Sequence, residues 1–310
     1  MNKPKLAISA CLLGHKVRHD GGDKHDNYII DVLSKFADLV PICPEVEMGL
    51  GVPREPIRFV MEGNEKKLVG TKSEIDYTSL GKKVAESICK SLSDVDGIIL
   101  MKKSPSCGLE KVKIYHKGIP MNDGIGVFAE TFIKTYPTIP HLDSGRLMNN
   151  ALKEQFLRQV FSYYIFKTTV NSVKDLQSFH KSHKYFIMEH HPQKVAVLGK
   201  IAAESKGIPF SKTKSIYQEE YFKTLKILTT KSKKCNVFMH LMGYLKDHLN
   251  AKEKQKFIKL IEDYKTGKTN YVSVWTMLKH YIEKYDVSYL KDHVYFNPIS
   301  YELGLLQYKE

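Results

Sequence analysis

VDGIILMKKSPSCG, residues 95–108, joins a short apolar run to a polar loop, and this junction decides how the first part of the chain folds. The apolar run is typical of a buried β-strand. The loop contains two lysines, a proline between two serines, a cysteine and a glycine. Two earlier apolar runs also end at a cysteine, because LAISA precedes Cys11 and LVPI precedes Cys43. Three predicted strands therefore end in the same way.

Residues 1–150 alternate these strand-like runs with segments whose apolar residues recur at helical spacing. Such segments occur at residues 27–39 (NYIIDVLSKFADL), 76–93 (DYTSLGKKVAESICKSLS) and 124–143 (GIGVFAETFIKTYPTIPHLD). The alternation predicts an α/β domain with a mostly parallel sheet and helices on both faces.

Residues 151–310 differ in composition, because glycine and proline are sparse there and lysine and tyrosine are frequent. We interpret them as a second, mostly α-helical domain, with the boundary near residues 145–165. Helical periodicity is present in residues 151–166, 172–190, 193–206, 215–230, 233–249, 251–267 and 272–285.

The composition is globular, with a net charge of +14 and a pI of about 9.3. A basic excess of this size favours a polyanionic partner, most often nucleic acid, over lysines that only solvate the surface. The apolar runs are too short for a membrane span. The start of the chain reads as a strand and not as a signal peptide, so we expect a cytoplasmic protein with no membrane partner.

Five cysteines in such a chain point to metal binding or catalysis before disulfides. Because the carboxyl ends of parallel strands share one edge of a sheet, Cys11, Cys43 and Cys107 can meet there. There is no CxxC pair, and three thiolates suit a cluster or a catalytic metal with an open position. The other interpretation is that they are small buried hydrophobes, which we prefer for Cys89 and Cys235.

Polar residues accompany the three cysteines at this predicted edge. Glu45, two residues after Cys43, is a candidate general acid or base, and Ser104 and Ser106 flank Pro105. Loop arginines can hold phosphate or a carbonyl oxygen, although solvated loops and surface ion pairs are equally common. The arginines at these strand ends are Arg18, Arg54 and Arg58.

The segments ISACLLGHKVRHDGG, CPEVEMGLGVPREPIR and KKSPSCG resemble the three motifs of the thiouracil desulfidase (TudS) family. The resemblance implies a Rossmann-like domain with an oxygen-sensitive 4Fe–4S cluster, held by cysteines that match Cys11, Cys43 and Cys107. It also implies an open iron that takes the sulfur of a thiocarbonyl base, which water then replaces without net redox change. The acid/base glutamate of the family falls on Glu45 and its active-site serine on Ser104.

The second half resembles the YbgA-type domain, through residues 179–203 and 236–267. The joined architecture resembles desulfidases of the RudS type, which implies 4-thiouridine in tRNA as the substrate. A folded RNA also explains the charge, because lysine and arginine contacts to phosphate provide most of the affinity. The candidate RNA-binding residues are Arg18, Lys103, Lys181, Lys184, Lys212, Lys214, Lys231, Lys233 and Lys234.

A group of histidines in the second half has the wrong pattern for a common zinc motif. For His180, His183, His190 and His191 we favour polar packing or RNA contact over metal binding.

Three functions remain open from the sequence. The first is an iron–sulfur desulfidase that converts 4-thiouridine in tRNA to uridine and releases hydrosulfide. The second is the same chemistry on free thiouracil or thiolated nucleosides, with the helical domain serving oligomerisation. The third is a nucleic-acid-binding protein with structural cysteines and no catalysis. No obligate protein partner is evident.

Overall fold

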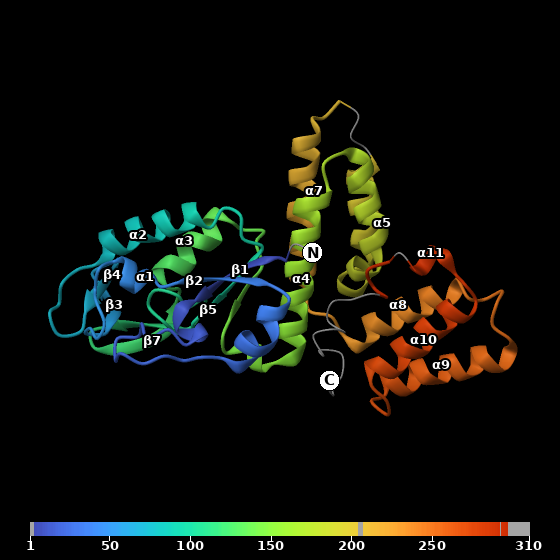
Figure 1. Cartoon of the computed structure of the whole chain (residues 1–310), viewed down its shortest axis with the longest axis horizontal. Coiled ribbons are helices and arrows are strands. Elements are labelled where there is room, and N and C mark those ends of the chain that lie inside the picture. Colours follow the sequence, from blue (N-terminus) through green and yellow to red (C-terminus); the bar gives the residue numbers. More distant parts are fainter. Residues whose placement is uncertain (1–2, 204–206, 292, 297–310) are drawn as a thin grey trace. The chain divides into compact units, whose positions relative to one another are not determined.

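A computed structural model describes residues 3–203, 207–291 and 293–296 of the chain (Figure 1). The chain divides into two compact units, residues 1–164 and 165–310. The helix α4 (Asn150–Thr169) runs through this division, so the change of unit falls inside a helix that the sequence analysis assigned to the second domain. None of the described helices is long and apolar enough to cross a membrane.

The first unit is built on a four-stranded, fully parallel sheet in the order β2-β1-β5-β8. Its strands are β1 (Lys5–Ser9), β2 (Asp38–Ile42), β5 (Gly97–Leu100) and β8 (His141–Asp143). In the middle strands nearly every residue is buried, which explains why they read as continuous apolar runs. The predicted Rossmann-like α/β fold is confirmed.

Two helices lie side by side over one face of this sheet (Figure 1). The helices α2 (Thr78–Ser91) and α3 (Val127–Thr135) pack together on one face, where Ile88 and Phe132 bury their side chains with Ile98 of β5. On the other face the first part of α4 approaches closely, because a Cβ added at Gly97 would lie 2.7 Å from Val160. Glycine at this position lets the helix come close to the sheet.

A second sheet of the first unit was not predicted. It has the order β4-β3-β6-β7, and only the β3–β6 pair is parallel. The strands are β3 (Ile57–Glu62), β4 (Glu65–Gly70), β6 (Val112–His116) and β7 (Ile119–Gly124). Lysine and glutamate on the exposed faces hide the apolar alternation, and five of the six residues of β7 are exposed.

The predicted helix at residues 27–39 is irregular in the structure. It forms a π-helical turn, η2 (Tyr28–Val32), followed by a 3-10 turn, η3 (Leu33–Lys35), and Asp38 already begins β2. Two further short elements stand at strand ends, the 3-10 turn η1 (Ala10–Leu13) and the single-turn helix α1 (Pro44–Glu47). The 3-10 turn η4 (Arg146–Met148) precedes α4.

The second unit is helical in all of its described elements, as predicted. After α4 come α5 (Val173–His190), α6 (Pro192–Ala203), α7 (Phe210–Leu225), α8 (Lys231–Gly243), α9 (Ala251–Lys265), α10 (Tyr271–Lys284) and α11 (Ser288–Lys291). Side chains of Ser172, Thr230, Asn250 and Asn270 accept backbone N–H bonds at the starts of α5, α8, α9 and α10. These caps satisfy donors that have no partner within the helix.

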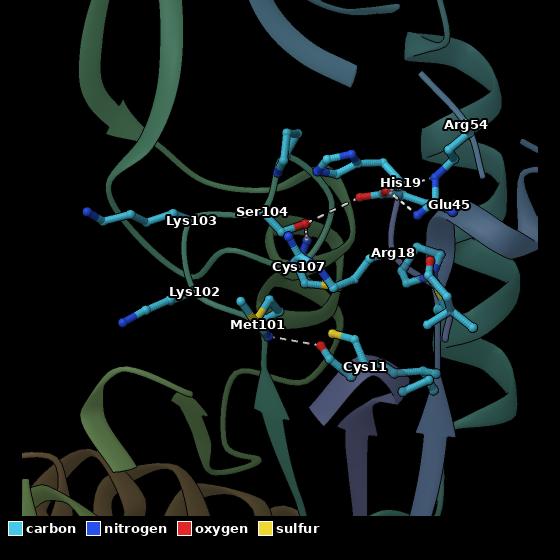
Figure 2. Close-up of a pocket in the computed structure, with 17 residues that line it drawn as sticks. Cys11, Arg18, His19, Glu45, Arg54, Met101, Lys102, Lys103, Ser104 and Cys107 are labelled. Carbon is cyan, nitrogen blue, oxygen red and sulfur yellow. Dashed lines mark hydrogen bonds and ion pairs between the residues drawn. The ribbon is translucent and has the colours of Figure 1, made fainter. Parts of the chain in front are cut away.

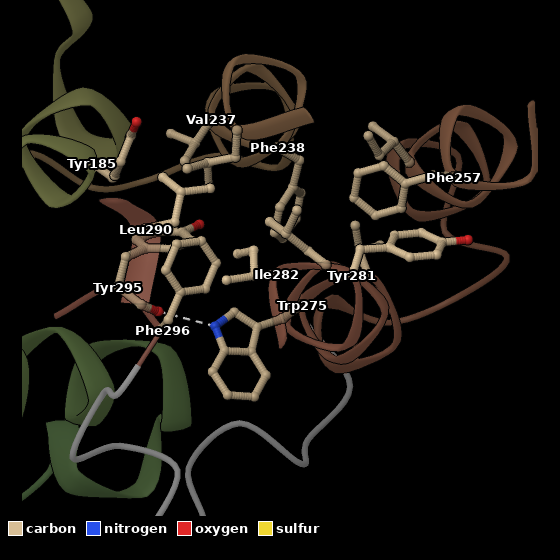
Figure 3. Packing of buried hydrophobic residues seen from close by; sticks show 14 of the residues in the cluster. Tyr185, Val237, Phe238, Phe257, Trp275, Tyr281, Ile282, Leu290, Tyr295 and Phe296 are labelled. Atoms are coloured by element: carbon tan, nitrogen blue, oxygen red, sulfur yellow. Dashed lines mark hydrogen bonds between the residues drawn. The ribbon is translucent and has the colours of Figure 1, made fainter. Parts of the chain in front are cut away.

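The core of this unit is strongly aromatic (Figure 3). Phe238 of α8, Phe257 of α9 and Trp275 of α10 are buried in one cluster with Tyr185 of α5. The Trp275 indole donates a hydrogen bond to the Tyr295 carbonyl at 3.0 Å, so its polar atom is satisfied in the core. Many tyrosines of this unit are therefore packing residues.

Candidate active site

The three strand-end cysteines of the first unit line one cavity of about 330 Å³ (Figure 2). Cys11 follows β1, Cys43 follows β2 and Cys107 lies in the loop after β5. Because β2, β1 and β5 are neighbours in the parallel sheet, their carboxyl ends bring the cysteines together. The predicted convergence is confirmed, and the other two cysteines, Cys89 and Cys235, are buried in hydrophobic cores.

Short helical turns hold the first two cysteines. Cys11 lies in η1, which ends at Gly14 with a φ of +85°, a left-handed conformation that glycine adopts without steric cost. Cys43 precedes α1, and its carbonyl accepts hydrogen bonds from the N–H groups of Val46 and Glu47 at 3.1 Å each. The backbone of both residues is thus fixed within one or two residues of the strand end.

The Cys107 loop is held by its own serine and by the start of α3. Ser104 Oγ accepts hydrogen bonds from the N–H groups of Ser106 and Cys107, at 3.1 Å each. The α3 N–H groups of Phe128 and Ala129 bond the Ser106 carbonyl at 3.0 and 3.2 Å. The loop is therefore rigid because its polar groups are already paired.

Glu45 is held by three side chains. Oε2 accepts hydrogen bonds from Arg54 Nε at 3.1 Å and from Arg54 Nη2 at 2.5 Å. Oε1 accepts from Ser106 Oγ at 3.1 Å and, more weakly, from Ser104 Oγ at 3.4 Å. The Arg54 side chain is 5% exposed and the Glu45 side chain 16% exposed, so the ion pair is largely shielded from water.

The thiols stand in a partly buried site in which negative charge is unfavourable. Burial, together with the neighbouring Cys43, raises the pKa of Cys11 to about 11. Burial also raises the pKa of Cys43 and of Cys107, and the other two thiols contribute to the shift at Cys107. A cationic group bound between the cysteines would remove this penalty and favour the thiolates.

These residues have the donor set of an iron–sulfur cluster, because three cysteine sulfurs line the same cavity. A cluster of several irons is wider than one ion, so its ligands stand farther apart around a cavity. Three soft sulfur donors on a shared cavity match that requirement.

The cavity rim is basic. Arg18, Lys102 and Lys103 line it, and the last two are exposed. His19 also lines the cavity, and its carbonyl accepts the Arg54 N–H at 2.9 Å. Arg58 lies elsewhere, on β3, with its guanidinium 5.3 Å from the Tyr115 ring centroid.

Sequence reasoning gave Ser106 no role and offered Arg54 only as a loop arginine that can hold phosphate or a carbonyl oxygen. In the structure Ser106 is fully buried and bonds Glu45, and Arg54, nine positions after Glu45, pairs with its carboxylate. The motifs contained both residues, but which oxygen each one bonds depends on the folded loops. His19 was not considered at all, and nothing in its sequence neighbourhood distinguishes it.

The predicted RNA-binding lysines of the second unit differ in their surroundings. Lys184 bonds two tyrosine hydroxyls, Lys214 bonds the Val170 carbonyl, and Lys233 bonds the His190 carbonyl. Lys231 lies 5.7 Å from the Tyr264 ring centroid, and Lys234 is buried. Lys181 and Lys212 are exposed. The structure does not bring these seven lysines together, and their RNA contacts stay a prediction.

The histidines of α5 are packed in the interior. His183 is buried, stacks on Phe179 with ring centroids 3.8 Å apart, and bonds the Phe179 carbonyl at 3.0 Å. His180 Nδ1 is 3.0 Å from Tyr217 Oη, and His190 Nδ1 is 2.5 Å from the Ile227 carbonyl. For these three histidines the contacts are polar packing, one of the two interpretations that the sequence analysis favoured over metal binding.

Comparison with known proteins matches each part of the chain to a different family. A family model described as 2-thiouracil desulfurase matches residues 6–144, and one described as a protein of unknown function (DUF1722) matches residues 184–300. The uncharacterized protein YbbK of Bacillus subtilis is 30% identical over 112 residues, which cover 33% of this chain and 72% of YbbK.

Two further similarities concern single parts of the chain. The uncharacterized protein YbgA of Escherichia coli is 33% identical over 61 residues, which cover 20% of this chain and only 36% of YbgA. The solved structure of a [4Fe-4S]-dependent thiouracil desulfidase, TudS, is 30% identical in sequence and has a TM-score of 0.37. It covers 49% of this chain and 97% of that one.

The resemblance read from the motifs is thereby confirmed, for the first unit and for the YbgA-type second part. The chain belongs to the 2-thiouracil desulfurase family, and the part that matches this family is followed by a part similar to YbgA.

Proposed function

We propose that this protein is an iron–sulfur desulfidase that replaces the sulfur of a thiolated uracil by oxygen, and that its substrate is 4-thiouridine in tRNA. The observation that carries the proposal is the cavity that Cys11, Cys43 and Cys107 share with Glu45 and Ser104. Family membership supports the desulfidase reaction, and the net charge of +14 supports the RNA substrate.

The cofactor of the proposal is a 4Fe–4S cluster held by Cys11, Cys43 and Cys107. When bound, the cluster supplies a soft Lewis acid that prefers a thiocarbonyl sulfur to the oxygen of ordinary uridine. The name of the solved TudS relative gives that protein the same kind of cluster.

The protein side chains supply the proton transfers of the reaction. Glu45 Oε1 faces the serine side of the cavity and takes a proton from the water that adds to the thiocarbonyl carbon. Arg54 fixes Oε2, so the carboxylate keeps one orientation while the C–O bond forms. Glu45 then gives this proton to the sulfur, and the C–S bond breaks so that the sulfur leaves as hydrosulfide. The hydroxyl that was added to the ring loses its remaining proton to solvent as the carbonyl forms, and Glu45 is again a carboxylate.

Ser104 holds two parts of the site in place, the Glu45 carboxylate and the Cys107 loop. Its hydroxyl donates to Glu45 and accepts the N–H of Cys107, so it links the carboxylate to the cysteine loop. The basic rim formed by Arg18, Lys102 and Lys103 suits the phosphates that flank a base turned out of its stack.

The test uses protein purified without oxygen and incubated with thiolated tRNA, with 4-thiouridine and uridine quantified after digestion. The proposal expects uridine to appear in step with the loss of 4-thiouridine. It expects Cys11→Ala, Cys43→Ala and Cys107→Ala to lose both iron and turnover, and Glu45→Ala to lose turnover alone. Conversion of free thiouracil with untouched tRNA would contradict the substrate, and a cluster-free, colourless active protein would contradict the cofactor.

A further inference from the structure

A second cavity lies inside the second unit, and neither the desulfidase reaction nor the family matches assign a role to it. Its volume is about 390 Å³, which falls in the range of small-molecule sites. The wall comes from α5, from the end of α4 and from the region of α11. The polar residues used below are Thr169, Asp175, Ser178, Lys181, Ser182 and Tyr289.

One end of this cavity has an uncompensated positive charge. The ammonium groups of Lys181 and Lys184 lie 5.0 and 5.1 Å from the ring centroid of Tyr289. Lys184 also donates hydrogen bonds to the hydroxyls of Tyr289 at 2.8 Å and Tyr244 at 3.2 Å. Neither lysine forms an ion pair with a carboxylate of residues 3–203, 207–291 or 293–296. Of these two lysines only Lys181 lines the cavity, so an anion bound there would meet its ammonium group.

The other end of the cavity offers a hydrogen-bond acceptor. Asp175 uses Oδ2 to accept from the Asn171 N–H at 3.1 Å and from Ser172 Oγ at 2.9 Å. Both of these hydrogen bonds are on Oδ2, so Oδ1 has room to accept one from a ligand. Asp175 precedes Lys181 by six residues on α5, a rise of about 9 Å along the helix. The carboxylate is thus far enough from the cationic end to leave room for an anion there.

Hydroxyl groups lie between the two ends. Ser182 Oγ donates to the Phe179 carbonyl at 3.0 Å, and Thr169 Oγ1 donates to the Ile165 carbonyl at 2.8 Å, so both oxygens can still accept from a ligand. Ser178 is exposed to the cavity side of α5. A suitable ligand therefore has an anionic group at one end and several hydroxyl or N–H donors along its length.

We propose that this cavity binds a nucleotide, with the phosphate beside Lys181 and the donors of the sugar and base directed toward Asp175. A free mononucleotide and a nucleotide within an RNA chain carry the same groups, and the experiment below separates them. The site does not depend on the desulfidase reaction, because it is formed within the second unit and its test measures binding.

The experiment measures binding to the full chain by calorimetry, with uridine 5′-monophosphate, uridine and inorganic phosphate as ligands. The monophosphate fills both ends of the cavity, so we expect saturable binding at one site, at least about tenfold tighter than for either fragment. Lys181→Met keeps the aliphatic stem and removes the charge, and we expect it to weaken monophosphate binding about tenfold. The matched control is Lys256→Met, on the exposed face of α9 away from this wall, which should leave the affinity unchanged.

Asp175→Asn is a second variant, with its melting temperature measured alongside because Asp175 also stabilises the start of α5. It should weaken the monophosphate and leave inorganic phosphate unaffected. A parallel arm uses a short single-stranded RNA. If the mononucleotide fails to bind but the RNA binds and responds to Lys181→Met and not to Lys256→Met, the phosphate belongs to an RNA chain. Equal effects of the two lysine variants in both arms, or no saturable binding in either, would overturn the site.

Discussion

At the scale of single residues, the Ser106 side chain contacts the candidate active site through Glu45. Its hydroxyl donates to Glu45 Oε1 at 3.1 Å, whereas the Ser104 bond to the same oxygen is longer at 3.4 Å. Hydrogen bonds to a charged group contribute about 1.5–3 kcal/mol. We expect Ser106→Ala to lower turnover about tenfold, with unchanged iron content and unchanged substrate affinity.

The control for Ser106→Ala is Ser91→Ala at the end of α2, where the hydroxyl bonds only the Ile88 carbonyl. Both variants remove one hydroxyl, but only Ser106 contacts Glu45. Equal turnover of the two variants would show that Ser106 does not position the carboxylate. A loss of iron in Ser106→Ala would instead assign Ser106 to the fold of the Cys107 loop.

Arg54 holds Glu45 through a planar guanidinium group with several N–H donors, which a lysine side chain does not have. Two of its nitrogens bond Glu45 Oε2, and Nη1 donates to the Gly51 carbonyl at 2.9 Å. Arg54→Lys keeps the charge but loses the planar fork, so turnover should fall while the protein stays folded. Arg54→Met leaves a shielded carboxylate unpaired and should lower the free energy of unfolding by about 3 kcal/mol. Denaturant unfolding and turnover, measured on both variants, check these expectations. Equal unfolding free energies of the two variants would contradict them.

At the scale of elements, the contact between the start of α3 and the Cys107 loop depends on Gly126. A Cβ added there would lie 2.5 Å from the Ser106 carbonyl oxygen and 2.9 Å from the Cys107 nitrogen. Both are backbone atoms that cannot rotate away. Gly126→Ala must therefore displace the cysteine loop, and we expect a loss of about 1–3 kcal/mol in stability together with reduced iron content.

The comparison for Gly126→Ala is Gly243→Ala at the end of α8, where an added Cβ meets no atom within 4 Å. Alanine favours helix over glycine, so this variant should be neutral or stabilising by up to about 1 kcal/mol. Thermal unfolding and iron analysis distinguish the two. Full iron content in Gly126→Ala would mean that α3 does not hold the loop.

The helix α5 makes the second unit sensitive to acid. Burial, together with the nearby Lys184 charge, lowers the pKa of His180 to about 4. Burial lowers the pKa of His183 to about 3. The unfolded chain binds these protons near pH 6.5 and the folded chain does not, so stability is full above pH 6.5 and falls as the pH drops toward 4.

His180→Gln keeps a polar partner for Tyr217 and removes one of these titrating groups. Between pH 6 and pH 5 the wild-type protein should therefore lose about 1 kcal/mol more unfolding free energy than the variant. Urea unfolding at both pH values measures this difference. Parallel pH dependence of the two proteins would show that His180 takes up its proton in the folded state.

The elements also show what a sequence reveals and what it hides. The parallel strands were predictable because burial on both faces leaves continuous apolar runs, as in residues 97–100. The edge strand β7 was not, because its residues are mostly exposed and carry no pattern. The three cysteines were predictable as a group, since strand ends converge in any parallel sheet. The bonds of Ser106 and Arg54 to Glu45 were not, since they depend on loop conformations that no periodicity encodes.

At the scale of the whole molecule, the positive charge is concentrated in the second unit. Residues 1–164 contain 23 lysines and arginines and 20 acidic residues, whereas residues 165–310 contain 25 lysines, no arginine and 14 acidic residues. Arginine is the side chain that most often reads guanine through two hydrogen bonds. A unit whose basic residues are all lysines is suited to phosphate contacts that are independent of sequence. In the proposed function, recognition of the thiolated base would therefore be left to the cysteine cavity of the first unit.

The surroundings of each lysine then predict how tRNA binding responds to mutation. Lys212 is exposed and forms no ion pair or side-chain hydrogen bond with the described residues, so its ammonium group is available to phosphate. Lys233 is engaged, since it donates to the His190 carbonyl at 2.7 Å and to the Leu228 carbonyl at 3.3 Å.

Lys212→Met should reduce the slope of log affinity against log salt by about one without changing stability. Lys233→Met should lower the unfolding free energy by about 1–2 kcal/mol and leave the slope nearly unchanged. Titrations of tRNA at several salt concentrations, paired with thermal unfolding, test both. Equal slopes in the two variants would mean that exposure does not decide which lysines bind RNA.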